Sequence, residues 1–484
     1  MGMQKKKNRT KQVFSLAALL LMLITVFSCF SAAAASENEE QSNGTGKKYI
    51  IAMDTTFAPF EFEDSQGNRV GIDVELLEAI AKDQGFEYEA RAIGFDAALQ
   101  AVESGQADGI LAGCSITEER QKKMDFSTPY FDSGISMAVS KENDSIQSYE
   151  DLRGKKVAVK VGTEGATLAN KLSEQYGFSV VTFDDSANMY EDVKLGNTAA
   201  CFEDYPVLGY AISQDIGLKL VGEKEAGSSY GLGVKKGQNA ELLQMFNDGL
   251  ENVKASGEYQ RILDSYISSG DGTAANVESN EGVNFFTLLG TTFPRFVQAA
   301  GVTLWITAVS LVFAVVLGLL FCALRLSKYK VLHAITRVYL WVIRGTPVIV
   351  QAFMIYFGIP KLFGFTMPVE VASIITLTLN AGAYLSEIFR RGIEAVDVGQ
   401  MEAARSLGLP YMKTMQKVIL PQAARIVIPS VINQFIITLK DSSILSVIGL
   451  AELTKVGKAI VAQNLESFNT YLILAIYYLI LVSL

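Results

Sequence analysis

The chain has 484 residues, enough for two to four domains, and 49% of them are hydrophobic. Residues 36–284 hold 21 Lys and Arg against 43 Asp and Glu, whereas residues 285–484 hold 16 against 8. The acidic balance of the first part argues against a nucleic-acid partner, because phosphate binding needs a basic face. The contrast indicates that the two parts work in different environments.

Residues 1–35 are typical of a secretion signal. Five basic residues precede the apolar run Val13–Phe30, and small residues suited to cleavage follow at Ala32–Ala35. Cys29 lies in a segment similar to a lipoprotein cleavage box, so the signal could be cleaved, lipidated or kept as an anchor. In each case the residues that follow are exported. Residues 36–48 are polar and are expected to form a tether.

From residue 49 to about residue 268, short β-type runs alternate with helical patterns. We expect strands at Tyr49–Met53, Ala107–Ala112, Lys156–Lys160 and Ala199–Phe202, and a helix at Asp73–Gln84 whose apolar residues share one face. This alternation predicts βαβ units with largely parallel sheets. The length is sufficient for two hydrophobic cores.

A segment rich in Gly, Ser and Asn follows and is expected to be a flexible linker at residues 269–284. The chain then becomes apolar over stretches long enough to cross a lipid bilayer. We expect about five helical spans, at Val297–Leu324, Leu340–Ile359, Val369–Phe389, Ile426–Leu445 and Phe468–Leu484.

The distribution of basic residues predicts the orientation of these spans. Four Lys or Arg residues follow the first span and six follow the third, whereas the connection after the second holds only Lys361. Because cytoplasmic loops carry the excess of Lys and Arg, the first span should run from outside to inside. Residues 36–284 should therefore be extracytoplasmic, in agreement with the signal at the N-terminus.

The polar segment 397–421 between two spans has the pattern of a cytoplasmic helix–turn–helix. Val398–Ser406 is helical in character, and Gly408 can adopt the left-handed conformation that ends a helix. Pro410 suits the first turn of a second helix, which Pro421 is expected to stop.

This segment resembles the EAA loop of ABC importer permeases, and residues 285–484 are similar to the permease group for polar amino acids. The resemblance implies an all-α transmembrane type I importer domain whose loop transmits ATPase closure to the spans. It also implies a permease dimer, with a second copy of this chain or with a different permease. The sequence has no G-x-x-x-x-G-K-[ST] phosphate loop, so the ATPase should be a separate subunit. The residues matched to the loop signature are Glu402, Ala403, Ala404, Gly408 and Pro421.

The exported part resembles periplasmic solute-binding proteins for polar amino acids, of the family 3 type. The likeness runs through 54–64 (DTTFAPFEFED), 70–81 (VGIDVELLEAIA), 110–134 and 157–166. It implies a two-lobed α/β fold over residues 49–268 that closes on its ligand. We expect one lobe at 49–137 and 230–268, and the other at 138–229.

In that family the ligand is an amino-acid zwitterion. Arg120 matches the position that binds the carboxylate, with Ser115 and Thr163 as further donors. Asp204 matches the position that binds the ammonium group, with the carbonyl of Gly113 as a second acceptor.

The remaining matched positions hold the side chain of the ligand. Phe57 and Phe95 should form the walls around its aliphatic part. Asp54 and Lys160 match positions that glutamine-binding relatives use for the amide, whereas Glu203 stands where those relatives have histidine. A polar amino acid is expected, with glutamine favoured. Glu203 could instead favour a cationic side chain, although Lys160 would oppose it.

Two other classes of function fit less well. A ligand-gated channel on this binding fold would insert its spans within the binding domain, and an enzyme would need an acid–base pair, for which Asp54 and Glu203 are the nominal candidates. Neither arrangement explains a binding domain followed by a permease, so no catalytic residue, metal or cofactor is expected.

Overall fold

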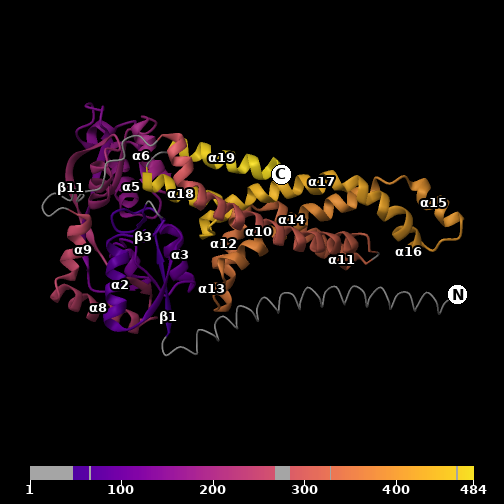
Figure 1. Cartoon of the computed structure of the whole chain (residues 1–484), viewed down its shortest axis with the longest axis horizontal. Helices are drawn as coiled ribbons and strands as arrows, with labels where there is room; N and C mark the ends of the chain where they lie inside the picture. The colour runs from indigo at the N-terminus through magenta and orange to yellow at the C-terminus, as the bar shows by residue number, and fades with distance from the viewer. Residues whose placement is uncertain (1–46, 65–66, 268–283, 328, 465–466, 484) are drawn as a thin grey trace. The chain divides into compact units, whose positions relative to one another are not determined.

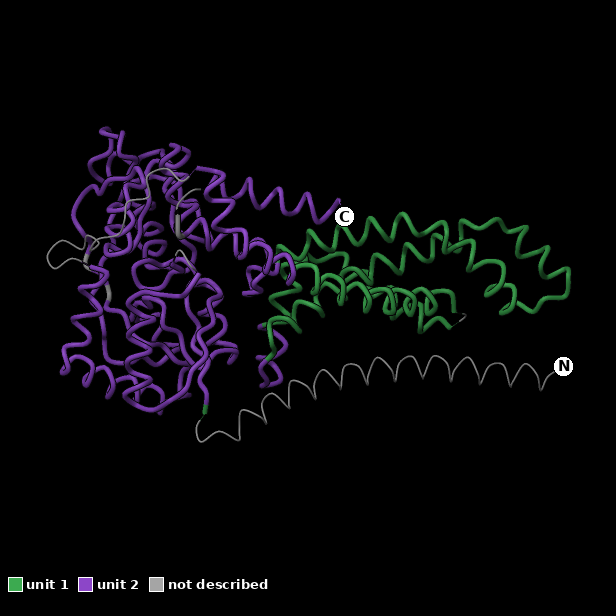
Figure 2. The backbone as a smooth tube through the Cα atoms, viewed as in Figure 1, with its two compact units in different colours: residues 1–47, 303–356, 367–444 green, residues 48–302, 357–366, 445–484 purple. Residues whose placement is uncertain are grey.

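The structure is a computed structural model that describes residues 47–64, 67–267, 284–327, 329–464 and 467–483. The expected signal segment with Cys29, residues 36–46 of the tether and residues 269–283 of the linker lie outside these ranges. The chain divides into two compact units, which Figure 2 distinguishes by colour. Unit 2 comprises residues 48–302, 357–366 and 445–484, and unit 1 includes residues 303–356 and 367–444.

Within unit 2, a first five-stranded sheet has the order β4-β1-β5-β12-β6. β1 (Lys48–Met53) runs parallel to β4 (Glu87–Ala92) and to β5 (Gly109–Ile110). β12 (Gly233–Lys235) pairs antiparallel with β5 and with β6 (Met124–Phe126). The strand expected at Ala107–Ala112 is shorter in the structure, because the chain leaves the sheet after Ile110 and turns toward Gly113, which has φ +52°.

Helix α2 (Ile72–Gln84) shows why the sequence builds this layer. Its residues Leu76, Leu77 and Ile80 are fully buried in the core that includes β1, and Gly85 ends the helix in the left-handed conformation. Helix α2 packs on helices α8 and α9, which return from the end of the domain (Figure 1). The bounds of the other helices around this sheet are α3 (Phe95–Ser104), α4 (Glu118–Gln121), α8 (Ala240–Ala255) and α9 (Glu258–Tyr266).

A second five-stranded sheet, with the order β11-β7-β10-β8-β9, forms a separate core. Its parallel strands are β8 (Lys156–Lys160), β9 (Ser179–Phe183) and β10 (Ala200–Asp204). Its antiparallel strands are β7 (Phe131–Ser140) and β11 (Leu218–Tyr230). The accompanying elements are a 3-10 turn (Tyr149–Leu152), α5 (Glu164–Tyr176), α6 (Ser186–Lys194) and α7 (Tyr205–Ser213). The small ribbon of β2 (Phe62–Glu63) with β3 (Arg69–Val70) lies between β1 and α2, in the lobe of the first sheet.

Two crossovers join the sheets, one from β6 to β7 and one from β11 to β12. The lobe boundary expected at residue 137 falls inside β7, which pairs with β11 from Phe131 to Ser140. The strand therefore belongs to the second sheet as a whole. The two crossovers at residues 126–131 and 230–233 are the only places where the described backbone passes from one sheet to the other, which is the arrangement of a hinged two-lobed fold.

Beyond the linker the described chain is helical. Three helices are long and apolar enough to cross a membrane: α10 (Phe285–Arg325), α14 (Val369–Glu394) and the continuous helix Tyr411–Ile448. They contain the first, third and fourth expected spans. The last expected span corresponds to α19 (Ser467–Ser483), a shorter apolar helix that follows α18 (Leu453–Asn464).

The second expected span, Leu340–Ile359, is not one straight helix. The chain forms α11 (Lys330–Gly345) and then the helical segment Val348–Phe363, with a bend of 109° between them. Pro347 explains the break, because it lacks an N–H and forces Thr346 into the extended conformation. The second segment comprises α12 (Val348–Phe353), a π-helical turn (Met354–Gly358) and α13 (Ile359–Phe363).

The expectation that Pro421 stops a helix is also wrong. Helix α16 (Tyr411–Thr414) continues through a π-helical turn (Met415–Ile419) into α17 (Leu420–Asp441), with Pro421 in the first turn of α17. A π-turn widens the helix before Pro421. The helix can therefore continue although proline has no N–H to donate to the preceding turn. The second helix of the loop is therefore continuous with the span that follows.

Candidate ligand-binding site

A pocket lies where strands of both sheets end. Asp54 follows β1 and Gly113 follows β5 of the first sheet, while Thr163 follows β8 and Asp204 ends β10 of the second sheet. The carboxyl ends of parallel strands are the usual binding edge of α/β sheets. About 230 Å³ of space between these residues is free of protein atoms, part of it open to solvent.

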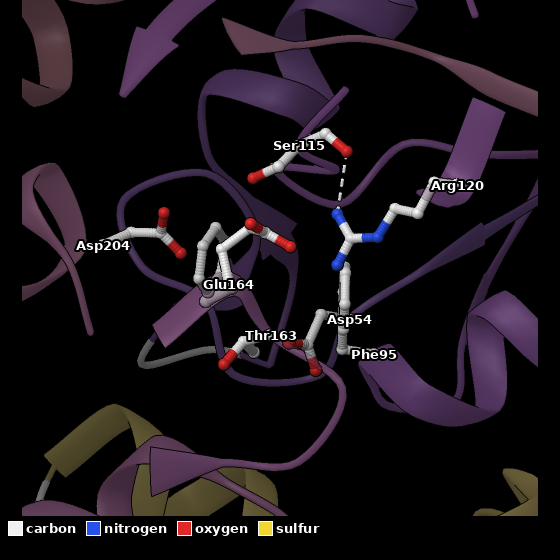
Figure 3. Close-up of a pocket in the computed structure, with 9 residues that line it drawn as sticks. Asp54, Phe95, Ser115, Arg120, Thr163, Glu164 and Asp204 are labelled. Carbon is white, nitrogen blue, oxygen red and sulfur yellow. Dashed lines mark hydrogen bonds between the residues drawn. The ribbon is translucent and has the colours of Figure 1, made fainter. Parts of the chain in front are cut away.

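Most of the expected site residues gather at this pocket (Figure 3). Lys160 and Glu203 do not line it, because they are buried below it with about 1% of their surface exposed. Glu164, which follows Thr163, lines the pocket and was not expected from the sequence; its place at the start of α5, beside a matched residue, was the available signal. The lining residues are Asp54, Phe57, Phe95, Gly113, Ser115, Arg120, Thr163, Glu164 and Asp204.

Arg120 enters the pocket from the short helix α4, whose first turn is capped by Thr117. Its guanidinium lies 5.1 Å from the ring centre of Phe95. Nη1 donates to the carbonyl of Ser115 at 2.8 Å, and Nη2 donates to the carbonyl of Gly162 at 3.0 Å. A guanidinium has five N–H groups, so donors remain for an anionic group.

Asp204 faces Arg120 from the opposite side of the pocket (Figure 3). Its side chain is 5% exposed, and Oδ1 accepts a hydrogen bond from the hydroxyl of Ser133 at 3.2 Å. Burial, together with the neighbouring Glu203, raises the pKa of Asp204 to about 7. A carboxylate so poorly stabilised favours a cationic ligand group, which would lower that pKa again.

Helix α5 directs its N-terminus to the same space. The hydroxyl of Thr163 accepts from the amide of Ala166 at 3.3 Å and donates to the carbonyl of Lys160 at 2.8 Å. The side chain therefore serves as a helix cap rather than as a direct donor to the pocket. The remaining backbone N–H groups of the first turn favour an anionic group through the helix dipole.

The side chains buried below the pocket are charged, and most of them have partners. Lys160 forms an ion pair with Asp54, and each side chain is 1% exposed. Because Asp54 belongs to the first sheet and Lys160 to the second, this pair joins the two lobes. Glu203 accepts from the hydroxyl of Ser186 at 2.7 Å and from the amide of Asp204 at 3.2 Å. Burial raises the pKa of Glu203, and Lys160 opposes that shift.

One wall of the pocket depends on a glycine. Gly113 has φ +52°, and a Cβ at this position would overlap Cε1 of Phe57. Any larger residue would therefore push the Phe57 ring out of place. The close approach also leaves the Gly113 peptide at the pocket surface.

A second candidate site is the polar loop of unit 1. Helix α15 (Val398–Ser406) has the expected bounds. Gly408 has φ +83°, and a Cβ there would have no atom within 4 Å, so glycine is required by conformation and not by space. Glu402, Ala403 and Pro421 are exposed, whereas Ala404 is buried. Leu407 at the end of the helix is 84% exposed, and Val398 at its start is 70% exposed.

Both halves of the chain match known protein families. Residues 49–269 match the model of bacterial extracellular solute-binding proteins, family 3, and residues 311–484 match that of the inner membrane component of binding-protein-dependent transport systems. A probable amino-acid permease protein YxeN of Bacillus subtilis is 40% identical over 39% of this chain and 85% of its own length. The glutamine transport system permease protein GlnP of Escherichia coli is 38% identical over 39% of this chain and 86% of its own.

A solved structure resembles the first half. An ancestral arginine-binding protein bound to arginine is 40% identical and covers 45% of this chain and 97% of its own, with a TM-score of 0.43. Together with the two-lobed fold and the apolar helices described above, the family matches identify both parts. The chain belongs to the amino-acid ABC transporter family and joins a family 3 solute-binding domain to a permease component of the inner-membrane type in one polypeptide.

Proposed function

We propose that the outer domain captures a polar L-amino acid and delivers it to the permease domain of the same chain. The observation that supports this most is the placement of Arg120 and Asp204 on opposite sides of one pocket (Figure 3). An α-amino acid carries a carboxylate and an ammonium group at a fixed separation, and these two side chains offer the complementary charges. Phe57 and Phe95 supply apolar walls for the part between.

Glutamine is the side-chain preference that we propose. Asp54 lines the pocket and is paired with Lys160 below it, so it offers an acceptor without a net negative charge, which suits a neutral amide better than a cation. Glu203 is engaged by Ser186 and by the amide of Asp204, so it has little capacity left for a cationic side chain. The permease half is 38% identical to the glutamine permease GlnP and 36% identical to the arginine permease ArtQ, so this likeness does not separate the two ligands.

Transport is proposed to be driven by a separate ATPase subunit at the loop 397–421, with Glu402, Ala403, Ala404, Gly408 and Pro421 forming the coupling surface. The exposed side chains of Val398, Leu407 and Tyr411 are compatible with a protein partner there, because contact with that partner would cover several apolar groups of one loop. A homodimeric permease with residues 36–284 outside the cytoplasm completes the proposal. The chain itself belongs to transporter families and not to an enzyme family.

Replacing Arg120 by Ala should weaken binding of the preferred amino acid about 100-fold or more, because a charge-assisted bidentate contact is lost. The measurement is isothermal titration of the purified full-length chain with each candidate L-amino acid. Arg153→Ala, at an exposed position remote from the pocket, is the matched control and should bind as the wild type does. Equal affinity of Arg120→Ala and wild type would show that the carboxylate binds elsewhere.

The same titration should rank the candidate amino acids by affinity. Glutamine should bind more tightly than arginine, because Asp54 is already neutralised by Lys160 and so has no free charge for a second cation. Glu203→His should still bind glutamine, since relatives with that specificity carry histidine there. A clear preference for arginine or lysine would contradict the glutamine assignment while leaving Arg120 and Asp204 in their roles.

Affinity should depend on pH through Asp204. The ionised form binds the ammonium group, and its pKa in the free protein is about 7, so affinity should be full above that pH and fall as pH drops through it. The limiting decline is about tenfold per pH unit for a single group. Asp204→Asn should bind weakly and lose this dependence, whereas Asp215→Asn, on the exposed surface, should keep the wild-type profile. A flat wild-type profile between about pH 5.5 and 8.5 would exclude Asp204 as the ammonium partner.

Gly408→Val should abolish ligand-stimulated ATP hydrolysis in proteoliposomes that contain the partner ATPase, because valine cannot readily adopt φ +83°. Binding of amino acid to the outer domain should be unchanged. Gly408→Asn is the matched control, since asparagine tolerates the left-handed region and should retain most of the stimulation. Uptake without any ATPase, or full stimulation in Gly408→Val, would count against the proposed coupling.

A further inference from the structure

Two carboxyl groups that take no direct part in the pocket lie buried next to it. Glu61 and Asp73 are both 0% exposed. As ionised groups they leave three oxygens, both of Glu61 and Oδ1 of Asp73, without a hydrogen-bond donor in the described part of the chain. Buried carboxylate oxygens are rarely left unpaired, so the arrangement requires an explanation.

Asp73 connects this pair to the pocket. It lies in the first turn of α2, where its amide donates to the carbonyl of Phe60 at 2.9 Å. Its Oδ2 accepts from the amide of Gly113 at 2.8 Å. Gly113 is the residue whose conformation and close approach to Phe57 shape the pocket wall. The carboxylate of Asp73 therefore fixes the amide of Gly113, and the carbonyl of the same residue, one peptide group further on, is the one expected to accept the ligand ammonium.

Two cations lie near this pair, and both are engaged elsewhere. Lys160 from β8 is paired with Asp54, while Arg69 from β3 lies near Glu63 and donates to the carbonyl of Asp54 at 3.3 Å. Asp73, Asp54, Lys160 and Arg69 all act on Glu61 electrostatically, yet none donates a hydrogen bond to its oxygens. The hydroxyl of Tyr130 borders Asp73. Adjacent carboxylates in a dry site cannot both ionise readily, and in such pairs one retains a proton.

The direction of the pKa shifts indicates which of the two carboxyl groups retains the proton. Burial, reinforced by Asp73, raises the pKa of Glu61 well above its usual range. Burial raises the pKa of Asp73 only to about 6, because the amide of Gly113 stabilises its ionised form. At neutral pH the proton therefore belongs on Glu61 and the negative charge on Asp73.

We propose that Glu61 is a neutral carboxylic acid that donates a hydrogen bond to Oδ1 of Asp73, and that this acid–carboxylate pair positions Gly113 for recognition of the ligand ammonium. A single shared proton reduces the unpaired oxygens from three to one. Glu61 and Asp73 are thus positioning residues, which act on the ligand through Gly113. The role in recognition rests on the proposed function, whereas the protonation of Glu61 does not.

The protonation is tested on the full-length chain without ligand. Infrared difference spectra of the wild type against Glu61→Gln at neutral pH should show loss of the carbonyl band of a protonated carboxylic acid. Glu87→Gln, at an exposed position of β4, should show no such loss. Other buried acids cancel in the difference, so absence of the band in the Glu61→Gln pair would overturn the proposal.

The positioning role is tested by rescue. Glutamine keeps a donor at the position of Glu61, so Glu61→Gln should bind L-glutamine within about threefold of the wild-type affinity. Glu61→Leu keeps the volume but removes the donor, and its affinity should fall by about tenfold or more. Asp73→Ala, which removes the acceptor for Gly113, should lose at least as much.

The outcomes separate the two proposals. If the wild type bound no amino acid, the proposed function would fail, and the infrared comparison would still decide the protonation of Glu61. If the wild type bound glutamine but Glu61→Leu bound it as tightly as Glu61→Gln did, the positioning role would be wrong. If Glu61→Leu misfolded, two measurements would still decide the matter. They are the infrared comparison and the affinity of Glu61→Gln, which must stay close to that of the wild type.

Discussion

The binding half depends on how the charged side chains buried at the ends of its two sheets are neutralised. An ionised group removed from water is costly unless it is paired, and this site has more charges than internal partners. Lys160 and Asp54 neutralise each other across the lobes. Asp204 accepts from the neutral hydroxyl of Ser133 and stands beside a second buried carboxyl group, so its pKa is raised to about 7. The zwitterionic ligand proposed above would complete this set of charges, which is a physical reason for the lobes to close on it.

The backbone contributes to the same electrostatics. Strands β1, β5, β8 and β10 end at the pocket, so the peptide groups that follow them are free to face a ligand. Helix α5 adds the unpaired N–H groups of its first turn, with Thr163 fixing the geometry of the cap. Arg120 meanwhile hydrogen-bonds carbonyls from both lobes, at Ser115 and Gly162. One arginine therefore contacts both lobes and also lines the pocket.

Local patterns in the sequence predicted regular elements well where one chemical signal dominates. Strand β8 and helix α15 have the expected bounds, because β-branched alternation and a glycine stop leave little ambiguity. Proline was less informative. Pro347 breaks an expected span, whereas Pro421 does not stop a helix, because the preceding π-turn absorbs the missing hydrogen bond. Whether a helix can widen at that point depends on packing, which a single sequence does not display.

In the binding site, too, local sequence predicted some features and packing determined the others. Residues that follow strands were predicted from the family pattern, since their spacing from the strand fixes where they lie. The depth of Lys160 and Glu203, the use of the Thr163 hydroxyl as a cap and the pairing of Glu61 with Asp73 depend on contacts between distant segments. In the permease half, the continuity of α16 with α17 has a mechanical consequence. A helix transmits displacement along its axis more faithfully than a flexible loop does, so a force applied near Tyr411 would pass through the π-turn into α17, where Pro429 is a further point of bending. Gly408, with φ +83°, is the point where the loop changes direction between its two helices, and the coupling proposed above would act through the continuous second helix.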